Sequence, residues 1–357
     1  VYADREELTE LIKVIKEYGG IYSTHWRRTG IRKERKELTI PEKIKGIIEA
    51  IEICKEIKVP LQISHIMSGY TIIPPPPPDL AAMAAKVTIG VIEEERKEGY
   101  DITFDVIPNI DGGVFVFRYI VSFLAPWIRE LGTIDALIKA MRISNFRDEV
   151  KQIIKSGKWW YLNPKADPYW ANRIKIEFSK NKSYIGKTIA EISKEKLQDP
   201  LDTFLDIVVE DPYAKVSTCF AYESEVIEFV RCEYSIICTD SFAFNYSWEM
   251  KRPPYFLPHP NTYGAFPRFI RKFVNELKIL SLEEAIRKIT YLPAMKLNLK
   301  GRGVIREGAY ADIVVFDPYE ISDVGDYIEP RRPPKGIHYV IVNGEIVVVN
   351  GKHLGKK

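Results

Sequence analysis

The sequence has few of the residues that build disulfide frameworks, and it lacks long apolar runs. It holds four cysteines in 357 residues, and no two of them form a Cys-x-x-Cys pair. In a chain of this length such cysteines are typical of reduced thiols in a cytoplasmic protein. No apolar run approaches the length of a membrane-spanning helix, and the first residues do not resemble a signal peptide. We therefore expect a cytoplasmic protein without a membrane partner.

An excess of charge of one sign is also missing. Lysine and arginine total 52 against 49 acidic residues, which gives a net charge of +3. This balance gives no reason to expect nucleic acid or an anionic membrane as a partner. The sequence contains no phosphate loop, no Gly-x-Ser-x-Gly motif and no dinucleotide fingerprint. Its 46% hydrophobic content can fill a sizeable core, and its length suggests several domains or one large barrel with an appendage.

Two of the five histidines each close a short apolar run. His25 ends the run 20–25, and His65 ends the run 59–65. Each run follows a helical stretch rich in lysine and glutamate, and each is short enough for a buried strand. In an α/β barrel, the carboxyl ends of the strands form the face that holds ligands and metals. The sequence therefore predicts that both imidazoles lie on that face, where they could share one ion.

The first hundred residues alternate between helix and strand, which favours a parallel sheet with crossover helices. Aromatic residues crowd the next part, about 112–185, where we expect an inserted helical subdomain over the barrel mouth. The alternation is expected to return after it. The expected helices are 4–18, 41–57, 80–98, 188–209, 222–231, 265–276 and 281–290, and the expected strands are 20–25, 59–65, 101–106, 214–219 and 234–239.

The last part of the sequence changes to short strands. A strand is expected at 309–317, and a hairpin at 339–349 with an Asn-Gly turn. We therefore expect a catalytic barrel over residues 1–300 and strands of a small β-sandwich over 301–357. Because the first residues enter directly into a helix that feeds a strand, we interpret the chain as truncated, with the other half of the sandwich upstream.

The candidate chemistry rests on histidine and aspartate. Imidazole is a frequent zinc ligand, so His25 and His65 are candidate metal ligands. Asp240 follows the apolar run 234–239 and could ligate a second metal, take a proton from metal-bound water, or simply cap a helix. Asp105 also ends a strand, and a turn-forming role is favoured there. His259 begins a stretch rich in turn formers, where it either shapes the pocket or packs the loop.

These segments together resemble the N-acyl-D-amino-acid deacylase (D-aminoacylase) family of the amidohydrolase superfamily, over nearly the whole chain. The stretch 303–312 is general to metal-dependent amidohydrolases. The run His-Pro-x-x-Tyr-Gly-x-Phe-Pro-Arg at 259–268 is specific to this branch. The matching stretches are 20–27, 62–65, 239–240, 259–268, 280–294 and 303–312.

The resemblance implies a (β/α)8 TIM-type barrel of the metal-dependent hydrolase kind, incomplete at the N-terminus, with a small β-sandwich. It also implies zinc-dependent hydrolysis of N-acyl-D-amino acids or related acylated amines. By this resemblance Asp240 is the catalytic carboxylate, which activates water and then protonates the leaving amine. The implied metal ligands are His25, His65 and Asp240, and the implied substrate-binding residues are Arg27, His259, Asn261 and Tyr263.

The sequence departs from the family in two ways. The family's His-x-His pair and cysteine ligand lie upstream of this sequence, and no His-x-His occurs here. Asn261 stands where the family has an arginine, Met67 where it has a lysine, and 105–109 reads Asp-Val-Ile-Pro-Asn instead of Asp-x-Tyr-Pro-Tyr. Losing a cation removes a charge-assisted grip on a substrate carboxylate.

Two alternatives therefore stay open. The chain could be an amidohydrolase for a cyclic or neutral amide, or a catalytically inactive fragment or scaffold that lacks the upstream metal ligands. For both enzyme hypotheses, the expected partner is a small-molecule substrate, an acylated amino acid or an amide. A homo-oligomer and an upstream split-gene partner both remain open.

Overall fold

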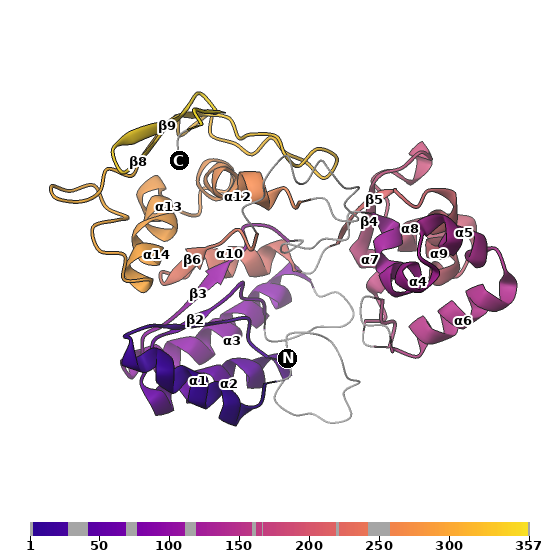
Figure 1. Ribbon diagram of the computed structural model, residues 1–357, viewed down its shortest axis with the longest axis horizontal. Helices are drawn as coiled ribbons and strands as arrows, with labels where there is room; N and C mark the ends of the chain where they lie inside the picture. Colours follow the sequence, from indigo (N-terminus) through magenta and orange to yellow (C-terminus); the bar gives the residue numbers. More distant parts are fainter. Residues whose placement is uncertain are drawn as a thin grey trace.

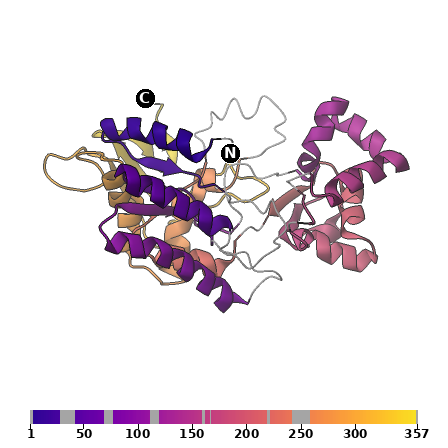
Figure 2. The same cartoon turned by 90° about the horizontal axis from the view of Figure 1, so that it is seen from below.

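The structure is a computed structural model, and it describes residues 3–27, 42–68, 77–110, 119–158, 162–165, 167–218, 221–241 and 258–355. These residues form two lobes (Figure 1). The larger lobe holds a parallel sheet, its helices and the C-terminal strands. The smaller lobe is mainly helical, and the second view also shows it set apart from the larger one (Figure 2). No helix in the described ranges is long and apolar enough to cross a membrane.

A four-stranded parallel sheet organises the larger lobe. Its strands lie in the order β1-β2-β3-β6, with Leu61 aligned to Tyr22 on one side and to Ile102 on the other. The predicted parallel sheet with crossover helices is thus present, and the described strands form an open sheet. The strands are β1 (Tyr22–Thr24), β2 (Leu61–Ile63), β3 (Ile102–Val106) and β6 (Ser235–Ile237), and the helices that follow the same alternation are α1 (Arg5–Glu17), α2 (Glu42–Ile57), α3 (Pro78–Lys97) and α10 (Glu223–Arg231).

Apolar side chains from the sheet and its helices form the core of the larger lobe. Phe104 of β3 is fully buried and meets Phe229 of α10 and Tyr234 edge-on, with ring centroids 5.8 and 5.3 Å apart. Such edge-to-face pairs stabilise a core beyond the area they bury. The helices are set by local signals: Asp4 caps α1 by accepting a hydrogen bond from the Glu7 amide at 2.8 Å.

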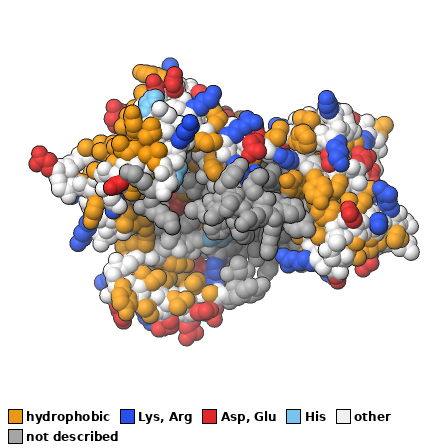
Figure 3. Space-filling view, turned by 45° about the horizontal axis from the view of Figure 1, so that its top comes forward, with side chains coloured by type: hydrophobic (Ala, Val, Ile, Leu, Met, Phe, Trp, Pro, Cys, Tyr) orange, Lys and Arg blue, Asp and Glu red, His pale blue; other side chains and the backbone are white. Residues whose placement is uncertain are grey.

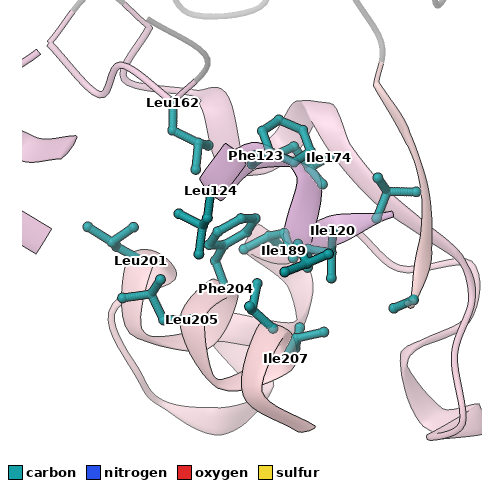
Figure 4. Close-up of a cluster of buried hydrophobic side chains, with 14 of the residues drawn as sticks. Ile120, Phe123, Leu124, Leu162, Ile174, Ile189, Leu201, Phe204, Leu205 and Ile207 are labelled. Carbon is teal, nitrogen blue, oxygen red and sulfur yellow. The ribbon is translucent and has the colours of Figure 1, made fainter. Parts of the chain in front are cut away.

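The smaller lobe has its own hydrophobic core. Phe204 is fully buried at its centre, among side chains from the surrounding helices (Figure 4). A two-stranded antiparallel sheet, β4 (Ile174–Phe178) with β5 (Lys215–Thr218), lies beside the helices. The helices are α4 (Ala125–Leu131), α5 (Ile134–Met141), α6 (Ser144–Lys155), α7 (Trp170–Arg173), α8 (Ile189–Lys196) and α9 (Pro200–Glu210), with short 3-10 turns η1 (Ile120–Leu124) and η2 (Lys182–Tyr184).

Two expectations for this region are wrong. The single helix expected at 188–209 is two helices, because Asp199 caps a new helix that begins at Pro200. The strand expected at 214–219 to continue the barrel pairs instead with β4, antiparallel. The core of the smaller lobe draws residues from Ile120 to Val216, well past the 185 expected for the insertion. Residues 112–118 and 159–161 lie outside the described ranges, and the division into domains stays a prediction.

The C-terminal part returns to the larger lobe. The helix expected at 265–276 begins earlier, as α12 (Asn261–Phe269), and continues as a π-helical segment, η3 (Ile270–Glu276). The hairpin turns at Asn343 and Gly344, both with positive φ, as an Asn-Gly turn requires. The remaining elements are α13 (Leu282–Ile289), α14 (Tyr291–Lys296), β7 (Ile313–Phe316), β8 (Ile337–Val342), β9 (Glu345–Val349) and β10 (Lys352–His353), whose strands form an antiparallel sheet in the order β10-β9-β8-β7.

Candidate metal and catalytic site

The structure brings the two strand-ending histidines together. His25 directly follows β1, and His65 lies two residues after β2. The backbone ladder continues past the strands, since the Ser64 amide donates to the Thr24 carbonyl at 2.9 Å. His25 Nδ1 and His65 Nε2 then lie 2.7 Å apart, with ring centroids 4.5 Å apart. Adjacent parallel strands therefore place two imidazole nitrogens at one point on the carboxyl edge of the sheet.

Trp26 holds the backbone beside His25 in place. Its indole is only 1% exposed, and its ring centroid lies 6.3 Å from the His25 ring and 6.1 Å from the His65 ring. Gly46 of α2 makes this close approach feasible, because a Cβ there would collide with the Arg27 carbonyl oxygen and come within 2.9 Å of the indole. The packing of α2 against residues 26–27 thus fixes the position of the backbone next to His25.

The backbone is unusual at two candidate residues. His65 has φ +38° and Asp240 has φ +43°, both in the left-handed region that non-glycine residues rarely adopt. Such conformations persist only where surrounding contacts hold them. At His65 these contacts come from Asp105: its Oδ1 accepts the His65 amide at 2.6 Å, and its carbonyl accepts the Ile66 amide at 2.8 Å.

Asp240 lies on the same edge of the sheet, beyond β6. The Cys238 amide donates to the Val106 carbonyl at 3.0 Å, which keeps the chain alongside β3 after the strand ends. The Cys238 thiol also hydrogen-bonds Asp105. Burial, followed by the charge of Asp105 and the bond to it, raises the pKa of Cys238 well above its ordinary value. The thiol thus links the end of β6 to the residue that holds His65.

A second group of predicted residues surrounds the start of α12. His259 and Asn261 are 1% and 2% exposed, and His259 Nδ1 accepts the Asn261 amide at 3.0 Å. Asn109, beyond β3, donates from Nδ2 to Asn261 Oδ1 at 2.5 Å. Asn109 was not chosen as a site residue from the sequence, although it ends the altered run 105–109. The Ser241 and Thr262 hydroxyls, 2.6 Å apart, join this helix start to the loop of Asp240.

The other two predicted substrate-binding residues lie on different elements. The Arg27 guanidinium forms a bidentate ion pair with Glu49 of α2, with Nε 2.8 Å from Oε2, and also contacts the Ala3 carbonyl. These bonds anchor Arg27 to the helix layer. Tyr263 is half-buried on α12. Substrate binding by either residue stays a prediction.

The imidazole pair has the donor chemistry of a zinc site. Two nitrogens bound to a tetrahedral zinc ion stand about 3.3 Å apart, so a small opening of the 2.7 Å pair would fit an ion between them. Across the described ranges, no three histidine, cysteine or acidic side chains are grouped so that they could hold a metal. The structure thus brings together two residues of the predicted ligand set, and metal binding by these histidines and by Asp240 stays a prediction.

Solved structures with a similar fold identify the class of fold. A crystal structure of D-aminoacylase, described as defining a novel subset of amidohydrolases, superposes with a TM-score of 0.62 at 24% identity. N-acyl-D-glutamate deacylase from Bordetella bronchiseptica, complexed with zinc and a phosphonate inhibitor, gives 0.58 at 20% identity. The two superpositions cover 99% and 98% of this chain and 58% of each solved chain. The fold is therefore of the amidohydrolase type, as predicted.

Sequence comparison points to the same relatives. The Amidohydrolase family matches residues 255–348, which include the stretch 259–268. The D-aminoacylase of Alcaligenes xylosoxydans xylosoxydans is 39% identical over 103 residues, which are 28% of this chain and 21% of that protein. The matched part thus spans about a fifth of that curated relative. These comparisons confirm the predicted resemblance to D-aminoacylases.

Proposed function

We propose that this chain is part of a zinc-dependent amidohydrolase that cleaves N-acyl-D-amino acids or related acylated amines. The observation that carries the proposal is the meeting of His25 Nδ1 and His65 Nε2 at the carboxyl edge of the parallel sheet. Two further findings support it. The relatives with similar sequence and fold are named D-aminoacylase and N-acyl-D-glutamate deacylase, and the latter is described in complex with zinc.

In this proposal His25 and His65 hold the zinc ion through the two nitrogens that now face each other. When bound there, zinc supplies Lewis acidity, which polarises the amide carbonyl and makes water a better nucleophile near neutral pH. Catalytic zinc sites use about three protein ligands and leave a position open. The pair therefore needs at least one more ligand, and Asp240 is the candidate within this chain.

Asp240 moves the proton in the proposed reaction. Its carboxylate takes a proton from the attacking water and then delivers it to the nitrogen of the leaving amine. A general base has to reach the proton it abstracts. The loop of Asp240 is held on both sides, by Cys238 along β3 and by the contact of Ser241 with Thr262, which would keep its carboxylate at the carboxyl edge of the sheet.

A second candidate, hydrolysis of a neutral or cyclic amide, is favoured by the uncharged pair Asn109 and Asn261. Both side chains are buried, and an amide recognises neutral carbonyl or amide groups rather than a carboxylate. The guanidiniums of Arg268 and Arg271 lie nearby on α12 and η3, but both pair with Asp323. Kinetics with D- and L-acylamino acids and their carboxamides separates the candidates: faster turnover of the carboxamides would favour the second.

The decisive experiment compares two histidine variants of the full-length protein. His65→Ala removes one nitrogen of the pair, whereas His353→Ala changes an exposed histidine in β10. We expect His65→Ala to lose zinc, measured by metal analysis and calorimetric titration, together with hydrolysis of N-acyl-D-amino acids. His353→Ala should keep both. Unchanged zinc binding in His65→Ala would reject the ligand assignment, and wild-type protein that binds no zinc would support the inactive scaffold.

A further inference from the structure

We infer that Asp105 is a positioning residue for His65, and that it acts by geometry rather than by charge. This inference rests on the proposed metal site. Sequence reasoning gave Asp105 a turn-forming role, but its side chain bonds to three groups. Oδ1 accepts the His65 amide at 2.6 Å, Oδ2 accepts Gln62 Nε2 at 2.8 Å, and the carboxylate also bonds the Cys238 thiol.

These bonds connect three neighbouring strands beneath the imidazole pair. Gln62 belongs to β2, Asp105 to β3, and Cys238 follows β6. Gln62 is itself held, because its Oε1 accepts a hydrogen bond from the Thr103 hydroxyl. Gln62 and Thr103 are only 7% and 9% exposed, so water does not replace these bonds readily. The carboxylate of Asp105 therefore has a fixed place relative to all three strands.

Asp105 holds the His65 backbone at two consecutive amides. Its side chain binds the amide of His65, and its carbonyl binds the amide of Ile66 at 2.8 Å. Between these two bonds, His65 adopts φ +38°, a conformation that costs about 1–3 kcal/mol unless its surroundings enforce it. This turn aims the His65 ring at His25. Without the side-chain bond, His65 is free to relax toward ordinary φ values, which would turn its ring away.

The test separates geometry from charge with two substitutions at one position. Asp105→Asn keeps an oxygen for the His65 amide and removes the charge. The Gln62 amide can turn over to face the new Asn amide, because the Thr103 hydroxyl that now donates to Gln62 can rotate to accept from it instead. Asp105→Glu keeps the charge but displaces the oxygen by one methylene. We expect Asp105→Asn to bind zinc within about threefold of wild type, and Asp105→Glu to bind it at least about tenfold more weakly, the scale known for residues that orient metal ligands.

A second readout needs no metal and does not depend on the proposed function. The ring ¹⁵N shifts of His65, measured by NMR in metal-free protein, report its hydrogen bond to His25. They should stay near wild type in Asp105→Asn and move in Asp105→Glu. Asp101→Asn and Asp101→Glu are the matched controls. Asp101 lies just before β3 begins, at the end of the strand away from His65, where it pairs with Lys296. Neither control should change the shifts.

Three outcomes would overturn the inference: no effect of either Asp105 variant, equal effects of both, or a larger effect of Asp105→Asn. If Asp105→Glu does not fold, Asp105→Ala removes the oxygen without adding volume and is judged by the same criteria. Wild-type protein that binds no zinc would reject the proposed function, and the ring shifts would still decide the role of Asp105.

Discussion

Lys288 of α13 is a fully buried lysine behind the parallel sheet. Its Nζ donates to the Cys232 carbonyl and, at 3.1 Å, to the Ser235 hydroxyl at the start of β6, and it lies 3.5 Å from Glu284. Burial lowers the pKa of Lys288, against the attraction of Glu284. The sequence pattern alone would have placed this lysine in water, since charged residues on an amphipathic helix usually face solvent.

We predict a pH dependence of stability from this residue. Because folding lowers the pKa of Lys288 below its ordinary 10.5, the folded state binds fewer protons than the unfolded state just below that pH. The contribution of Lys288 to the free energy of unfolding should therefore increase as pH rises toward 10.5, by at most about 1.4 kcal/mol per pH unit.

Denaturant unfolding of wild type and Lys288→Met at several pH values from 8 to 10 measures the effect. The difference between the two proteins should change with pH in the predicted direction, and Lys300→Met, an exposed lysine, serves as the control. A difference that stays constant over this range would show that Lys288 titrates alike in the folded and unfolded states.

At the scale of elements, α2 positions the site through Gly46. We predict that Gly46→Ala weakens zinc binding, because the added Cβ collides with the Arg27 carbonyl and pushes residues 26–27, and with them His25, away from the helix. Gly90→Ala in α3 is the matched control, since its Cβ meets nothing within 4 Å. That control should gain up to about 1 kcal/mol of stability from helix propensity. Zinc titration and thermal unfolding check both, and equal zinc affinity of the two variants would contradict the prediction.

The sequence predicted well the elements that are determined by local sequence patterns. The two strands that precede His25 and His65 lie in short apolar runs, and the hairpin at Asn343-Gly344 has the expected turn residues. The antiparallel pairing of β5 with β4 was missed because a short apolar strand does not reveal its partner. The bonds of Asp105 and the pair of Asn109 with Asn261 were missed for the same reason: they join residues 40 and 152 positions apart, which no local pattern reports.

At the scale of the whole molecule, the two lobes have separate hydrophobic cores. Ile110 precedes the residues of the smaller lobe in the sequence and Ala221 follows them, and the Ala221 amide donates to the Ile110 carbonyl at 3.0 Å. The buried residues of the smaller lobe, from Ile120 to Val216, form a cluster distinct from the one around the parallel sheet. Hydrophobic side chains reach the surface of both lobes (Figure 3). Because the two hydrophobic cores are separate, we expect each lobe to unfold as its own cooperative unit.

We predict that the lobes unfold separately and that Phe204→Ala affects only the smaller one. Phe204 is fully buried and packs edge-on against Phe123 and Trp170, with centroids 5.8 and 6.0 Å apart. Its truncation leaves a cavity that costs about 3–5 kcal/mol. Hydrogen–deuterium exchange should then show faster exchange throughout α4–α9, with protection of β1–β3 and zinc affinity unchanged. A loss of protection in both lobes together would mean that they fold as one cooperative unit.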